Sequence, residues 1–285
     1  MLERYPVTRL IPLLVGLLAA CAADESAPPT HASLAVDGPY VVGSYTDFPD
    51  VMEFAQGTIY YPTDAETPVG GVAIAPGFTE AQEHIEWWGA RLASHGFAVL
   101  LLDTNDPREL PDARAEALIA AVGVLGDESE RSGSPIVGKV DGGRMAVMGH
   151  SMGGGGALLA ANAQGSALRA AIPFTPWEPE ADFAAVTIPT LVIAGSADQI
   201  APVDAHAWRH FQSIPASTPK LYMEIDGGDH FVADTERGPD LATVGRYVLA
   251  WLKLYVDGDE GYRTLLYDGL PPEDATAFSR YLAGD

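Results

Sequence analysis

The segment Gly149-His150-Ser151-Met152-Gly153 joins an apolar run to a stretch of small residues, and it is the feature that most restricts the fold. Residues 145–148 before it predict a buried strand, and residues 154–161 after it predict a closely packed helix. The glycines on either side of the serine tolerate the sharp backbone path that such a corner requires. A serine at a strand-to-helix corner of this kind is a nucleophile elbow. We therefore predict that Ser151 is a catalytic nucleophile.

Further apolar runs and helical patterns alternate along the chain. The runs cover residues 57–61, 71–75, 98–102, 170–174, 190–194 and 221–225. The helical patterns cover residues 84–95, 112–125, 203–211 and 241–255. Apolar runs without polar alternation are typical of strands covered on both faces, as in parallel sheets. The sequence therefore predicts an α/β-hydrolase fold, a doubly wound and mostly parallel sheet with helices on both faces and no lid domain.

The first residues are typical of an export signal and are excluded from the fold. Arg4 and Arg9 precede or begin an apolar run over residues 10–18, which is too short for a membrane-spanning helix. The run ends at Cys21, the only cysteine, and Leu18-Ala19-Ala20-Cys21 resembles the lipobox of bacterial lipoproteins. We expect a lipoprotein-type signal peptide over residues 1–20 and lipidation at Cys21. An ordinary signal peptide with an incidental cysteine is the alternative.

These features divide the chain and predict its location. Residues 21–36 predict a flexible tether, and residues 37–285 predict one α/β domain. We expect an exported protein, either a periplasmic or cell-surface lipoprotein or a secreted one. The formal net charge of −23 argues against nucleic acid and against adhesion to anionic lipid. We expect a monomer that contacts a membrane only through the lipid at Cys21.

The catalytic partners of Ser151 are expected at the carboxyl ends of neighbouring strands, where active groups gather in open α/β sheets. Asp198 follows the apolar run at 190–194, and His230 follows the run at 221–225. The order serine, acid, histidine is that of α/β-hydrolases. His230 would accept the serine proton, and Asp198 would orient the imidazole. Asp226 and Asp229 are alternative acids.

Other residues are expected around this triad. Met152 and Phe78 are the candidates for the oxyanion hole through their backbone N–H groups, because one follows the nucleophile and the other lies in the loop after residues 71–75. His150 adjoins the serine and is expected to line the site. The remaining histidines considered as bases fall on predicted helices, where a surface or core role is expected: His84, His95, His206 and His210.

Several segments resemble the bacterial cutinase and poly(ethylene terephthalate) hydrolase family. They are residues 57–62, 76–79, 87–97, 103–105, 149–156, 175–177, 198–203 and 250–253. The resemblance implies a serine carboxylic-ester hydrolase that cleaves cutin-like or poly(ethylene terephthalate)-like polyesters and short-chain acyl esters through an acyl-enzyme on Ser151. It also implies a cleft that holds an aromatic ring between Phe78 and Trp177, with Met152 and Ile200 completing the apolar walls.

The chain also departs from this family. Family members generally close the C-terminal segment with a disulfide, but here Tyr267 stands where one of those cysteines would align, and a single cysteine cannot pair within the chain. Some members bind calcium, yet no loop here has ligand spacing, so we expect no metal and no cofactor. A triacylglycerol lipase or general carboxylesterase without polymer activity is the alternative enzyme. An inactive, ligand-binding lipoprotein is the alternative outside enzymes.

Overall fold

The computed structural model describes Met1 and residues 29–179, 182–238 and 241–284. Residues 2–20 of the expected signal peptide and residues 21–28 of the expected tether, with Cys21, lie outside this part of the chain. Among the described residues, no helix combines the length and the apolar character needed to cross a membrane.

One sheet of nine strands organises the described chain, in the order β1-β2-β4-β3-β5-β6-β7-β8-β9. The six strands from β4 to β8 in this order are parallel to one another, whereas β1, β2 and β9 pair antiparallel at the two edges. The strands are β1 Val42–Tyr45, β2 Gln56–Pro62, β3 Val69–Ala75, β4 Phe97–Asp103, β5 Val140–His150, β6 Ala170–Phe174, β7 Thr190–Gly195, β8 Lys220–Ile225 and β9 Phe278–Ala283.

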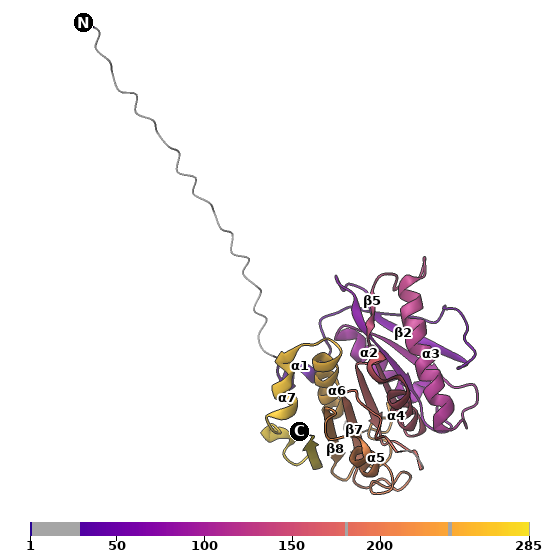
Figure 1. Cartoon of the computed structure of the whole chain (residues 1–285), viewed down its shortest axis with the longest axis vertical. Helices are drawn as coiled ribbons and strands as arrows, with labels where there is room; N and C mark the ends of the chain where they lie inside the picture. Colours follow the sequence, from indigo (N-terminus) through magenta and orange to yellow (C-terminus); the bar gives the residue numbers. More distant parts are fainter. Residues whose placement is uncertain (2–28, 180–181, 239–240, 285) are drawn as a thin grey trace.

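Helices cover both faces of this sheet (Figure 1). They are α1 His31–Leu34, α2 Glu86–Ser94, α3 Pro111–Glu130, α4 Met152–Gln164, α5 Ala207–Ser213, α6 Leu241–Tyr255 and α7 Arg263–Tyr267. Short 3-10 helices connect them: η1 Gln82–Ile85, η2 Gly165–Ala167, η3 Glu260–Tyr262 and η4 Pro272–Asp274.

Two hydrophobic cores sandwich the sheet because alternate side chains of each strand point to opposite faces. In β3, Ala73 and Ala75 belong to the core that lies beneath α3, α4 and α5, whereas Val72 and Ile74 belong to the core that lies beneath α2 and α6. All four of these side chains are fully buried. Burial on both faces explains why the central strands are continuous apolar runs in the sequence, and the predicted doubly wound sheet is confirmed.

The N-terminal end of the described domain differs from the expected tether. Residues 31–34 form the short helix α1, which the tether prediction did not include. Leu34 is buried in the core under α6, and the His31 ring lies 5.1 Å from the Tyr247 ring. The Arg91 guanidinium donates to the Leu34 carbonyl and to the Asp37 carboxylate. Burial of Leu34 and the hydrogen bonds from Arg91 therefore hold this segment against the domain.

The C-terminal segment is held by polar contacts at the position where relatives were expected to have a disulfide. The Tyr267 hydroxyl lies 2.7 Å from that of Tyr255 on α6. Asp274 accepts hydrogen bonds from Arg246 at 2.6 Å and from Tyr247 at 2.7 Å. The segment then ends in β9, which pairs with β8 at the edge of the sheet.

Candidate active site

The nucleophile elbow forms where β5 ends and α4 begins. Ser151 has φ 56° and ψ −116°, a backbone conformation that typically costs a non-glycine residue about 1–3 kcal/mol. Its N–H donates to the Phe174 carbonyl at 3.0 Å, and its own carbonyl accepts from Gly155 and Trp177. These bonds hold the strained corner in place.

The glycines beside the serine are required by close backbone packing. A Cβ at Gly149 would lie 2.3 Å from the Gly153 carbonyl oxygen. A Cβ at Gly153 would lie 2.3 Å from the carbonyl oxygen of Ala75 on the neighbouring strand. No side chain fits at such distances, so the glycine pattern that pointed to the elbow has a direct steric cause.

The fold brings the three predicted triad residues together. The His230 Nε2 atom lies 2.8 Å from Ser151 Oγ, and its Nδ1 atom lies 2.7 Å from Asp198 Oδ2. The other carboxylate oxygen of Asp198 accepts the backbone N–H groups of Ile200 and Ala201, both at 2.8 Å. Asp198, rather than Asp226 or Asp229, therefore pairs with the histidine.

The triad hydrogen bonds select one tautomer of His230. An ionised Asp198 can only accept, so Nδ1 of His230 carries the proton. The lone pair of Nε2 is then free to accept the proton of the Ser151 hydroxyl. All three side chains are buried, which strengthens these interactions by lowering the local dielectric constant.

Two backbone N–H groups beside Ser151 are free to face a substrate. Met152 is the first residue of α4, and the first N–H groups of a helix lack intrahelical acceptors. In the loop after β3, Gly77 donates to Glu80 and Thr79 donates to the Pro107 carbonyl. Among the described residues, none accepts from the N–H of Phe78 that lies between them. These are the two donors predicted for an oxyanion hole.

A cavity of about 350 Å³ lies against Ser151 and His230. Two of its walls are exposed apolar side chains, since Phe78 is 46% and Ile200 is 54% exposed. The remaining lining residues are Thr79, Glu80, His84, Phe231 and Arg237. The Arg237 guanidinium lies 3.6 Å from the centre of the Phe231 ring, which it covers as a cation–π pair.

The other two predicted substrate-binding residues do not line this cavity in the described structure. The Trp177 ring stacks on the His206 ring, with centroids 5.8 Å apart, and it lines a neighbouring cavity of about 430 Å³. Its backbone N–H nevertheless donates to the Ser151 carbonyl at 2.9 Å, so Trp177 lies next to the elbow. Met152 is half-buried at the start of α4.

His150 does not line the cavity as expected but is buried behind it, with 1% of its surface exposed. Its Nδ1 atom lies 2.7 Å from Glu80 Oε2, and its Nε2 atom lies 2.8 Å from the His230 carbonyl oxygen. Burial alone would lower the pKa of His150, but the hydrogen bond and charge of Glu80 outweigh it and raise this pKa. Burial alone would raise the pKa of Glu80, but the bonds from His150 and Gly77 lower it.

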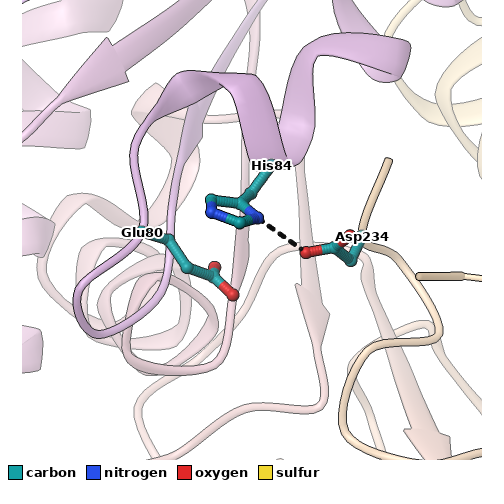
Figure 2. A group of neighbouring side chains, drawn as sticks. All are labelled: Glu80, His84 and Asp234. Atoms are coloured by element: carbon teal, nitrogen blue, oxygen red, sulfur yellow. Dashed lines mark hydrogen bonds and ion pairs between the residues drawn. The ribbon is translucent and has the colours of Figure 1, made fainter. Parts of the chain in front are cut away.

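A cluster of Glu80, His84 and Asp234 is the one group among the described residues whose ligand-type atoms gather closely enough to consider a metal ion, within 4.8 Å of one another. Figure 2 shows these side chains converging from two separate segments. Arg237 Nη2 lies among them, 2.7 Å from Asp234 Oδ2 and 3.3 Å from both Glu80 Oε1 and His84 Nδ1. The guanidinium cation takes the position of a metal ion, so we assign none to this cluster.

Comparison with known proteins identifies the family. A family model described as PET hydrolase-like matches residues 19–282. The chain belongs to this family. Cutinase 1 of Thermobifida cellulosilytica is 45% identical over 216 residues, which are 76% of this chain and 79% of that cutinase. The bis(hydroxyethyl) terephthalate hydrolase of Streptomyces coelicolor is 42% identical over 264 residues, which are 89% of this chain and 82% of that enzyme.

A cutinase of Thermobifida fusca is also 45% identical over 216 residues, which are 76% of this chain and 69% of that protein. Membership in this family confirms the resemblance found in the sequence motifs. It also confirms the α/β-hydrolase fold and the class of serine ester hydrolases. The cavity-lining residues that sequence reasoning missed are Glu80 and Arg237, for which the sequence shows no signal.

Proposed function

We propose that this protein hydrolyses polyesters of the cutin or poly(ethylene terephthalate) type, and short-chain acyl esters, through an acyl-enzyme on Ser151. The observation that carries the proposal is the unbroken path of hydrogen bonds from Asp198 through His230 to the Ser151 hydroxyl, at 2.7 Å and 2.8 Å. This path ends at a cavity with exposed apolar walls, which suits a bulky ester. The cutinase and terephthalate hydrolase relatives support the same substrate class.

The first half of the reaction acylates the enzyme. Ser151 Oγ attacks the ester carbonyl carbon while His230 Nε2 takes the hydroxyl proton. Asp198 stabilises the imidazolium that forms. The N–H groups of Met152 and Phe78 bind the negative oxygen of the tetrahedral intermediate, where removing one such donor typically costs about 2.7–4 kcal/mol. Collapse breaks the ester C–O bond, and His230 protonates the alcohol that leaves.

The second half releases the acid. Water enters the cavity, His230 takes one of its protons, and the resulting hydroxide adds to the acyl carbon. Collapse of this second intermediate breaks the bond to Ser151 Oγ, which recovers its proton from His230. The products are a carboxylic acid, an alcohol and the original enzyme, so atoms and protons balance without a cofactor.

Substrate binding divides between two neighbouring cavities. Phe78 and Ile200 line the cavity at the serine, and Trp177, whose backbone N–H donates to the Ser151 carbonyl, lines a separate one. We propose that an aromatic ring of the polymer lies against Phe78 and Ile200, and that Met152 and Trp177 border the path of the chain beyond the ester. A second cavity lined by Trp177, beside the elbow, suits an extended chain better than a single short acyl group.

The decisive experiment compares a polyester with a small ester. The wild-type enzyme should release terephthalate monoesters from a poly(ethylene terephthalate) film and also cleave nitrophenyl butyrate. Ser151→Ala, the matched control, should lose both activities, by up to about 10⁶-fold in kcat for the small ester. Cleavage of nitrophenyl butyrate with no release from the film would instead indicate a general carboxylesterase or lipase.

Export and anchoring form a separate proposal. We propose that residues 1–20 are a lipoprotein-type signal peptide, that Cys21 is lipidated, and that a monomeric domain reaches the cell surface or periplasm on a short tether. The docking of α1 shortens the expected tether, which was drawn over residues 21–36. Mass spectrometry of the N-terminal peptide from wild type and Cys21→Ala tests the lipid, and an unmodified Cys21 peptide in the wild type would refute it.

A further inference from the structure

A second pair of acid and histidine lies directly behind the triad. Glu80 Oε2 is 2.7 Å from His150 Nδ1, the same separation as in the pair of Asp198 and His230. Both members are buried, with 7% of Glu80 and 1% of His150 exposed. The centres of the His150 and His230 rings are 5.0 Å apart. The mechanism described above gives this pair no step.

The partners of His150 determine its protonation. Its Nε2 atom faces the carbonyl oxygen of His230, which can only accept, so this nitrogen carries a proton. Its Nδ1 atom faces Glu80, whose Oε2 already accepts the Gly77 N–H at 2.7 Å. Arg237 donates to the other oxygen of Glu80 at 3.3 Å. A carboxylate surrounded by donors is ionised, so Nδ1 of His150 also carries a proton and the ring is an imidazolium.

This imidazolium donates a hydrogen bond to the backbone carbonyl of His230. That carbonyl accepts from His150 Nε2 and from the Thr175 hydroxyl, both at 2.8 Å. His150 is the last residue of β5 and is covalently joined to Ser151. The bond therefore ties the loop that carries the catalytic base to the strand that carries the nucleophile. A charged donor makes this bond roughly twice as strong as a neutral one.

We propose that His150, kept in its imidazolium form by Glu80, positions the catalytic base His230 by holding its backbone carbonyl. This proposal rests on the proposed function, because it assigns a role in aligning His230 Nε2 with Ser151 Oγ. His150 is a positioning residue rather than a catalytic one, since it reaches the backbone of His230 and not the reacting atoms.

Other titratable groups around the pair come from three segments. Arg237 and Asp234 lie in the loop after β8, where Arg237 contacts both Asp234 and Glu80. His84 of η1 is hydrogen-bonded to Asp234, as Figure 2 shows. On the catalytic side, the His230 ring faces His150, and Asp198, in the loop after β7, is hydrogen-bonded to His230. Asp234 and Glu80 favour the charge on His150, while Arg237 opposes it from behind Glu80.

Steady-state kinetics on nitrophenyl butyrate test the positioning role. Glu80→Gln can still give His150 a neutral hydrogen-bond partner but removes the charge, and it should lower kcat by about five- to tenfold with KM changed less than about twofold. His150→Phe removes the donor and should lower kcat by about thirtyfold or more. His150→Gln keeps a neutral N–H within reach and should recover much of that loss.

Glu128→Gln is the matched control, because Glu128 is a buried carboxylate of α3 that pairs with Arg131 and itself lines neither cavity. It should lower stability while leaving kcat within about twofold of the wild type. Equal kcat values for Glu80→Gln, His150→Phe and wild type would overturn the proposal. Equal losses of kcat in His150→Phe and His150→Gln would also overturn it, since the N–H donor of the glutamine would then have no effect on the reaction.

A spectroscopic measurement on the unmodified enzyme tests the charge without relying on turnover. Nitrogen-15 NMR of the His150 ring at about pH 7 should show protons on both nitrogens, because the Glu80 carboxylate holds the second proton. A free imidazole is mostly neutral at that pH, so the two states can be told apart. Glu80→Gln should return the ring to a single proton. A singly protonated His150 in the wild type would overturn the proposal even if Ser151 is the nucleophile. Conversely, a charged His150 in an enzyme without esterase activity would refute the proposed function and leave this charge assignment standing.

Discussion

Two pairs of buried acid and histidine stand side by side in this protein, and they share a separation of 2.7 Å between carboxylate oxygen and Nδ1. They differ in what the second ring nitrogen faces. His230 Nε2 faces the Ser151 hydroxyl, which can donate a proton to it. His150 Nε2 faces a backbone carbonyl, which can only accept. In our proposal the first ring is therefore a neutral base and the second is a cation, so the role of each pair depends on the third group in its chain of hydrogen bonds.

Breaking the first pair, Asp198 and His230, should have the largest effect. Asp198→Asn keeps the acceptor for Ile200 and Ala201 but turns a donor toward His230 Nδ1, which favours the tautomer with its proton on Nε2. That nitrogen can then no longer accept from the serine, and kcat should fall by about 10⁴-fold, as in triads where the acid is replaced by its amide. Nitrophenyl butyrate hydrolysis measures the change.

Asp229→Asn is the matched control for that experiment. Asp229 precedes His230, and its carboxylate accepts only the Phe231 N–H among the hydrogen bonds found in the described residues. We expect kcat within about twofold of the wild type, because a surface change away from the reacting atoms has a small effect. If Asp229→Asn lost as much activity as Asp198→Asn, the assignment of the acid would be wrong.

The second pair, Glu80 and His150, should make the stability of the protein depend on pH. The pKa of Glu80 is lowered from 4.5 in the folded protein. Its contribution to the free energy of unfolding is therefore present above pH 4.5 and is lost as the pH falls through its pKa in the folded state. The pKa of His150 is raised from 6.5 in the folded protein. Its contribution to the free energy of unfolding is therefore full below pH 6.5 and is lost as the pH rises through its pKa in the folded state. The pair therefore stabilises the fold most between pH 4.5 and 6.5.

Urea unfolding of wild type and His150→Gln across this range measures the effect. The wild type should be more stable by about 2 kcal/mol inside the window, and the difference should shrink on both the acidic and the basic side. A wild-type advantage that grows steadily as the pH rises above neutrality would contradict the assignment of a positive charge to His150.

The central sheet could be predicted from the sequence, because strands buried on both faces leave continuous apolar runs. All seven predicted strands are present, and helix α6 has the predicted bounds 241–255. The edge strands β1 and β9 were missed, since half-exposed strands of four and six residues carry polar side chains. The helix α1 was missed because its docking depends on Leu34 meeting a core built from distant residues.

The sequence predicts those site residues whose location is set by the end of a strand. Ser151, Asp198 and His230 each follow a strand, and parallel strands place their carboxyl ends together. The contacts of Glu80 and Arg237 could not be read from the sequence, because they meet across loops 157 residues apart. Trp177 was expected in the cleft, but its side chain is stacked on His206, a contact between two loops that no spacing indicates.

The most direct test of the account is covalent labelling of the nucleophile. The enzyme is treated with an organophosphonate, digested and examined by mass spectrometry. We expect one adduct per chain on the peptide that contains Ser151, slow labelling of Asp198→Asn, and none of Ser151→Ala. An adduct on another residue, or undiminished labelling of Ser151→Ala, would contradict the claim that His230 and Asp198 activate this one hydroxyl.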